Sequence, residues 1–171
     1  MAITLIVEDG SIVPDANSYL SVEEATTILS VDFRKAPEWE ALTDAEKELM
    51  LTSATRYLDD NYQWYGRRVS AEQPLLWPRL GMRDCEKQCL SSTTIPSEVK
   101  KAVAYLALWL RKNDGEEVMN SDGVKRFRSE EVEIEWQEGF MGRKAPEFLA
   151  KFLICLGLGP NDRGFKPIIR K

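Results

Sequence analysis

The chain has 171 residues, of which 43% are apolar and 30% charged, a composition typical of a globular protein with one buried core. It has no histidine, so the usual general base is missing, and Ser–His and Cys–His catalysis are excluded. No run approaches the ~18 apolar residues of a membrane span, and the N-terminal segment MAITLIVEDG lacks the basic start of a signal peptide. We therefore expect a protein without a membrane segment, in the cytoplasm or in a particle assembled there.

The cysteines and the acid pairs do not indicate a metal site or a catalytic site. The three cysteines, Cys85, Cys89 and Cys155, are an odd set without the spacing of a secreted disulfide scaffold. Cys85 and Cys89 are also separated by three residues, and no histidine is present to complete a zinc site. Adjacent acids such as Asp59 and Asp60 point apart on a helix, which indicates solvated surface carboxylates. The sequence predicts a protein that is not an enzyme and binds neither a metal nor a cofactor.

Two capping boxes predict the first two helices. Ser21 with Glu24 opens SVEEATTILSV, and Thr43 with Glu46 opens TDAEKELMLTSATRYLDDNYQWY. Apolar residues at helical spacing follow each box, and Gly66 is a suitable stop for the second helix.

A proline-stiffened loop, QPLLWPRLGMRD, follows at residues 73–84, because its two prolines cannot lie inside a helix. Aromatic residues and arginines gather before and within it: Tyr57, Tyr62, Trp64, Tyr65 and Trp77 with Arg56, Arg67, Arg68 and Arg79. Such a set is used by subunit interfaces and also by sites that stack single-stranded nucleic acid. We favour the interface, because nucleic-acid binders are usually basic where they bind and the body of this chain is acidic.

The segment PSEVKKAVAYLALWLRKND, residues 96–114, is predicted to be a helix that is apolar on every face. Two arrangements bury such a helix: it is the central helix of a bundle, or a neighbouring subunit covers its far side. We predict subunit contacts on this helix and on the loop before it, at Arg67, Arg68, Trp77, Arg79, Tyr105, Leu108 and Trp109.

Alternating residues in VKRFRSEEVEIEW predict a β-hairpin at about residues 124–137, with Phe127 and Ile134 on its two strands. A lone hairpin is marginally stable in water, so we expect it to lie on the helices or to pair with another chain. Pro146 then opens a last helix, PEFLAKFLICLGL, which Gly157 caps.

The C-terminal end differs in charge from the rest of the chain. Residues 143–171 hold seven basic and two acidic residues, a net charge of +5, whereas the other 142 residues hold 16 basic and 26 acidic ones, a net charge of −10. This asymmetry predicts a tail that docks on an acidic surface, although a solvated tail has the same composition.

Four segments carry a family resemblance: VEDGSIVPDANSYLSVEEA, ATRYLDDNYQWYGRR, QPLLWPR and IPSEVKKAVAYLAL, in this order over about residues 7–110. They resemble a family of small tailed-phage and prophage proteins often labelled putative DnaT-like single-stranded-DNA-binding proteins. They are also similar to phage head–tail connector (adaptor, head-completion) proteins, the mostly helical subunits of a ring beneath the portal.

The resemblance to connectors implies a virion protein at the head–tail junction. It implies a homo-oligomeric ring, commonly twelve-fold, with the portal above, a tail protein or second adaptor (stopper) below, and double-stranded DNA passing through the channel without specific binding. It also implies a C-terminal segment that reaches the portal, and on this basis we assign portal docking to Arg163, Phe165, Lys166, Ile168, Ile169, Arg170 and Lys171.

Together, these observations predict a mainly α protein. Residues 1–156 form a single domain, a bundle of about four helices with the β-hairpin as a small insertion, and residues 157–171 form an extended docking tail. The predicted function is that of a head–tail connector subunit. The alternative is a DnaT-like accessory protein that binds single-stranded DNA through Trp64, Trp77 and the neighbouring arginines.

Overall fold

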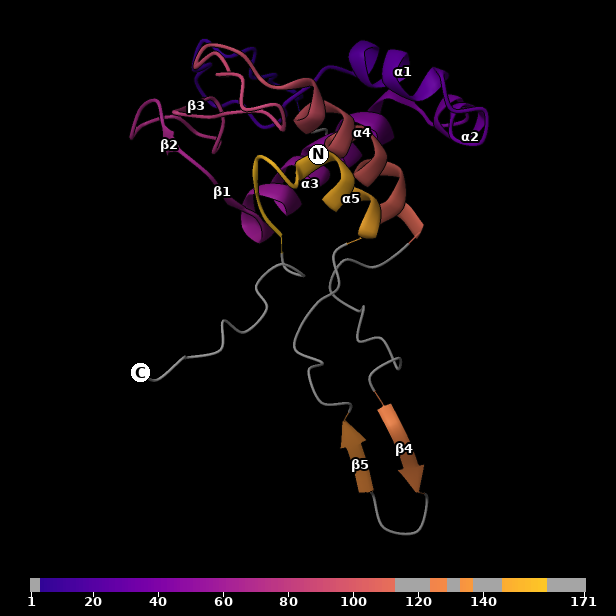
Figure 1. Ribbon diagram of the computed structural model, residues 1–171. Helices are drawn as coiled ribbons and strands as arrows, with labels where there is room; N and C mark the ends of the chain where they lie inside the picture. Colours follow the sequence, from indigo (N-terminus) through magenta and orange to yellow (C-terminus); the bar gives the residue numbers. More distant parts are fainter. Residues whose placement is uncertain (1–3, 113–123, 129–132, 137–145, 160–171) are drawn as a thin grey trace, which may run out of the picture.

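The computed structural model describes residues 4–112, 124–128, 133–136 and 146–159 (Figure 1). In this part of the chain the protein is mainly helical, as predicted, with helices α1 (Val22–Ser30), α2 (Ala36–Glu40), α3 (Asp44–Asn61), α4 (Ser97–Lys112) and α5 (Glu147–Leu153). The described strands form antiparallel pairs: β1 (Gln63–Trp64) with β6 (Gly157–Leu158), β2 (Arg67–Arg68) with β3 (Arg79–Leu80), and β4 (Val124–Arg128) with β5 (Glu133–Trp136). Among the described residues, none of the helices combines the length and hydropathy needed to cross a bilayer.

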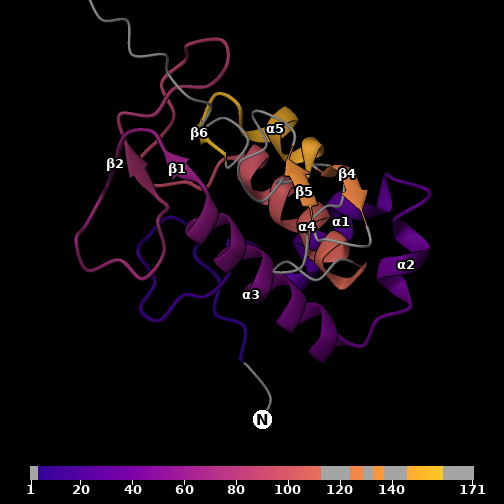
Figure 2. The same ribbon diagram turned by 90° about the horizontal axis from the view of Figure 1, so that it is seen from below.

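Helix α4 lies at the centre of the helical body. Figures 1 and 2 show α1, α3 and α5 around it, and each of the three contacts it. Its buried side chains are Val99, Ala102, Val103, Ala104, Leu106, Ala107 and Leu108. Helices of the same chain therefore cover much of α4, while Tyr105, Trp109 and Leu110 are half-buried. Cover of these side chains by a neighbouring subunit stays a prediction.

Both predicted capping boxes are present. The Ser21 hydroxyl accepts the N–H of Glu24 while the Glu24 carboxylate accepts the N–H of Ser21, and Thr43 and Glu46 repeat this exchange at the start of α3. Each box satisfies N–H groups that a helix start would otherwise leave unpaired.

Helix α3 ends at Asn61, before the predicted stop at Gly66. The reason is tertiary, because Gln63 and Trp64 leave the helix to pair with Leu158 and Gly157 near the other end of the chain. Gly66 instead forms the turn between β1 and β2, with φ of 65°, and a Cβ there would lie 2.3 Å from the carbonyl oxygen of Leu80.

The predicted β-hairpin is confirmed as the antiparallel pair β4–β5, in which Phe127 lies opposite Ile134 and Arg128 opposite Glu133. In Figure 1 the pair lies well away from the helices. Pairing with another chain, the second of the two predicted supports, stays a prediction.

Residues 155–159 are attached to the body of the protein, although an extended tail was predicted from residue 157. Gly157 and Leu158, predicted to begin the tail, are strand β6, and a Cβ at Gly159 would lie 3.0 Å from the ring of Tyr62. A disulfide joins Cys155, just after α5, to Cys85, 70 residues earlier. The sequence argued only against a secreted disulfide scaffold, and no local spacing reveals a bond between residues that only the fold brings together. In the chain-entropy model, such a loop closure stabilises the fold by about 4 kcal/mol.

Candidate functional site

The aromatic residues of the loop and of β1 form an internal cluster. Trp77 is fully buried, while Tyr62 and Trp64 are 5% and 6% exposed. The rings of Tyr62 and Trp64 are stacked with centroids 5.6 Å apart, and Trp64 meets Trp77 edge-to-face at 5.5 Å. Stacking of this kind stabilises a core beyond the area that it buries. Trp64 and Trp77 therefore have no free face for a nucleic-acid base.

Arg79 is also used inside the molecule. Its guanidinium donates to the carbonyl oxygens of Tyr65 at 2.6 Å, Leu76 at 3.0 Å and Gly66 at 3.0 Å. Burial lowers the pKa of Arg79 from its ordinary value, opposed by the nearby phenol of Tyr19 and carboxylate of Asp59. The fixed fork of donors on arginine suits this bridging of turns. Arg79 thus locks the β1–β2 turn to the loop rather than to a neighbouring subunit.

A buried hydrogen-bond group holds the loop to the rest of the body. The Tyr19 hydroxyl donates to the Asp59 carboxylate at 2.6 Å, and the same hydroxyl accepts the N–H of Trp77 at 3.2 Å. The Asp59 carboxylate also accepts the N–H of Leu76 at 3.0 Å. Burial raises the pKa of Tyr19 well above its ordinary value, and it raises the pKa of Asp59. Asp59 is therefore a structural acid, and its prediction as a solvated surface acid was wrong.

A fully buried carboxylate, that of Glu8, organises the N-terminal segment that carries the family resemblance. The Glu8 side chain accepts the N–H groups of Gly10 at 2.8 Å, Ile12 at 3.0 Å and Val13 at 2.9 Å. Gly10 has φ of 107°, and a Cβ there would lie 2.1 Å from the carbonyl oxygen of Thr93. This role of Glu8 was not predicted from the sequence, because an acid before a glycine turn indicates it only when the acid is known to be buried.

The structure divides the predicted subunit-contact residues. Trp77, Arg79 and Leu108 are buried within their own chain, so their assignment to an interface was wrong. Tyr105 and Trp109 are half-buried on α4, and the Tyr105 ring packs against the rings of Phe148 and Phe152. Only Arg67 and Arg68, on β2, are exposed. The predicted docking residues 163–171 lie outside the described residues.

Of the predicted aromatic and arginine residues, Tyr65, Arg67 and Arg68 are exposed at and just before β2, and we call them the β2 patch. Tyr65 is 45% exposed, and the two arginines lie on the strand directly after it. Tyr57, the other candidate for stacking, is half-buried on α3. The β2 patch can make charged contacts and one ring contact with a partner.

A cavity of about 180 Å³ lies beside the disulfide. Its lining combines acidic, sulfur and apolar side chains from the loop, from α4 and from the α5 end: Asp84, Cys85, Glu86, Glu98, Phe152, Cys155 and Leu156. In the part of the chain that the structure describes, no group of three His, Cys, Asp or Glu residues is arranged to hold a metal ion.

The hydrogen-bond group makes Asp59 essential for stability. We expect Asp59→Ala to lower the free energy of unfolding by about 2–4 kcal/mol, because it removes the acceptor for the Tyr19 hydroxyl proton and for the Leu76 N–H. The matched control is Asp60→Ala, which removes only an exposed ion pair with Arg56 and is expected to cost at most about 0.5 kcal/mol. Urea unfolding measures both, and equal losses would contradict the role given to Asp59.

Tyr19 also predicts an alkaline loss of stability. Since its pKa is raised in the fold, the unfolded chain releases the phenolic proton first, and the free energy of unfolding falls as the pH rises above about 10. Tyr19→Phe cannot titrate, so we expect it to be less stable at pH 7 and to lose less stability between about pH 9 and 11 than the wild type. Tyr65→Phe, at an exposed site, is expected to follow the wild-type profile in the same urea series. A Tyr19→Phe profile parallel to the wild type would refute this assignment.

Comparison with known proteins gives one family match. A family model described as "Putative DnaT-like ssDNA binding protein" matches residues 3–159. Searches of curated proteins and of solved structures found no match. The matched region contains every described element of the fold, including the β2 patch and the disulfide.

Proposed function

We propose that this chain, which belongs to the family of putative DnaT-like single-stranded-DNA-binding proteins, is a structural adaptor, the head–tail connector subunit of a tailed phage. The observation that carries the proposal is the internal use of the tryptophans and of Arg79, the side chains best suited to hold a nucleic-acid strand. Residues buried in the core in this way stabilise the fold of the subunit, and an adaptor subunit functions through its shape.

The electrostatics support the same proposal. Outside residues 143–171 the chain has a net charge of −10. Affinity for DNA phosphates comes mainly from lysine and arginine, so an acidic wall lets double-stranded DNA slide through a channel without adhering. In this proposal, α1, α3, α4 and α5 form a four-helix wall of a ring, commonly twelve-fold.

Two surfaces would make the contacts of the ring. Arg67 and Arg68 of the β2 patch would meet a neighbouring subunit, where exposed acids such as Glu40 and Asp44 offer complementary charge. The basic C-terminal segment would dock on the portal, and a tail or stopper protein would bind below. This segment begins no earlier than residue 160, since residues 157–159 belong to the body.

Electron microscopy with the cognate portal tests the proposal. We expect the full chain to form a ring on the portal. A variant lacking residues 160–171 is expected to stay folded, because every described element is retained, but to lose binding to the portal. Arg67→Glu/Arg68→Glu is expected to abolish the contact between neighbouring subunits, whereas Arg56→Glu, a charge reversal at an exposed site on α3, serves as the control. Portal binding that survives the deletion, or rings that survive the double reversal, would overturn the assigned surfaces.

The family match favours a second candidate, an accessory protein that binds single-stranded DNA. The residues first considered for it, Trp64 and Trp77, are buried, so binding would depend on the β2 patch. A single exposed ring and two exposed arginines give a small stacking and phosphate-binding surface.

Titration of a fluorescent oligonucleotide at two salt concentrations tests this candidate. Binding at micromolar concentration with a steep salt dependence, weakened about tenfold by Tyr65→Ala or by Arg67→Ala/Arg68→Ala, would favour it. Trp77→Ala is unsuitable as a test because it opens the core and is expected to cost about 3–5 kcal/mol in stability. Absence of binding at low salt would remove the candidate.

A further inference from the structure

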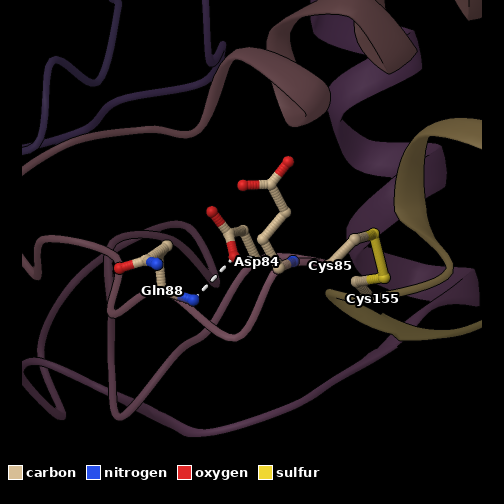
Figure 3. The surroundings of a disulfide bond; sticks show 5 residues. Asp84, Cys85, Gln88 and Cys155 are labelled. Carbon is tan, nitrogen blue, oxygen red and sulfur yellow. Dashed lines mark hydrogen bonds between the residues drawn. A yellow bond between two sulfur atoms is a disulfide. The ribbon is translucent and has the colours of Figure 1, made fainter.

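Among the described residues, the free thiol is that of Cys89, which lies in the same hairpin as the disulfide cysteine Cys85. Cys89 is free and exposed, Cys85 is exposed as well, and the chain reverses direction between them. Asp84 holds this reversal: its N–H donates to the carbonyl of Gln88 at 3.0 Å, and its carboxylate accepts the N–H of Gln88 at 2.8 Å (Figure 3). Cys89 thus lies directly beyond the turn that carries Cys85, and no helix or strand separates the two.

The disulfide is the covalent tie between this hairpin and the C-terminal end of the body. With three cysteines, the chain can hold only one internal disulfide at a time. Its other half, Cys155, is half-buried and lies between the end of α5 and β6. Both cysteines line the cavity, together with Phe152 and Leu156. An exposed disulfide with a free thiol close by in the chain is the arrangement that internal exchange requires.

We propose that Cys89 releases the C-terminal end of the body by thiol–disulfide exchange. The Cys89 thiolate attacks the Sγ of Cys85, a Cys85–Cys89 bond forms, and the Cys85–Cys155 bond breaks with Cys155 as the leaving thiolate. The proton lost by the Cys89 thiol is returned, through solvent, to Cys155. One disulfide and one thiol are present before and after the step, so no oxidant or reductant is consumed.

Attack on Cys85 rather than on Cys155 follows from the chain geometry. The residue opposite Cys89 across the hairpin is Arg83, which precedes Cys85 by two positions. Cross-strand diagonal neighbours of this kind lie about 7–8 Å apart at their Cα atoms, slightly beyond the ~4.4–6.8 Å span of a disulfide, so the exposed turn must move by about 1–2 Å to form the bond. The product ties residues that are already neighbours, so α5 and β6 are then held by packing and by the short β1–β6 pair alone. The exchange is a switch between a tethered and an untethered C-terminal end.

Trypsin can distinguish all the pairings, because cleavage after Arg83, Lys87, Lys100, Lys151 and Arg163 leaves each cysteine in a separate peptide. The oxidised full chain is incubated at about pH 8.5, where thiolate forms, then quenched in acid, alkylated with N-ethylmaleimide and digested without reduction. We expect linked peptides 84–87 and 88–100 to appear, with alkylated Cys155 in peptide 152–163. The rate should not depend on protein concentration, because the exchange is internal.

Cys89→Ser is expected to reduce alkylation of Cys155 by at least about tenfold, whereas Ser91→Ala, a neighbouring change that keeps the thiol, is expected to behave as wild type. As a separate test of the geometry, Cys155→Ser treated with oxidised glutathione is expected to form the Cys85–Cys89 bond within one chain. The proposal is overturned if Cys155 stays protected in the wild type, if Cys89→Ser exposes it equally, or if Cys155→Ser yields only mixed disulfides.

Discussion

The hydrogen bonds between Tyr19, Asp59 and the backbone of Leu76 and Trp77 are the constraint on which the rest of the structure depends. They join three parts of the chain that are distant in sequence: the N-terminal segment, α3 and the proline-stiffened loop. A buried carboxylate is unfavourable unless donors surround it, so the group stabilises one arrangement and penalises the alternatives. With the loop fixed in this way, Trp77 is positioned against Trp64, and Arg79 reaches the carbonyls of the β1–β2 turn.

This constraint explains why residues of nucleic-acid-binding type do not form a binding face. Tryptophan and arginine are common at interfaces because they offer area, stacking and several donors, and those properties serve equally well inside a small core. Here the loop has neither helix nor long strand to hold it, and it uses Trp77, packed against Trp64, and Arg79 to attach itself to the body. Tyr65, Arg67 and Arg68 are left for partners, on a short strand that the same contacts hold in place.

Local patterns in the sequence were sufficient for the helices and for the hairpin. The capping boxes at Ser21 and Thr43, and the apolar residues of α4, carry their structural meaning within one or two turns, and all three were predicted correctly. The short α2, with Pro37 in its first turn, has a periodicity too brief to recognise in the sequence. The errors concern residues whose surroundings come from elsewhere in the chain. The end of α3, the burial of Trp77, Arg79 and Leu108, the role of Asp59 and the Cys85–Cys155 bond all depend on contacts between distant segments.

The attachment of residues 155–159 has a mechanical consequence. A pull on the C-terminus first loads the two residues of β6, whose hydrogen bonds with β1 are few. It then reaches Cys155, where the covalent bond carries the load across to Cys85 and into the loop fixed by Tyr19 and Asp59. Helix α5 precedes Cys155 in the chain, so it lies outside this force path while the disulfide is intact. With the bond broken, the same pull would peel α5 from α4 one turn at a time.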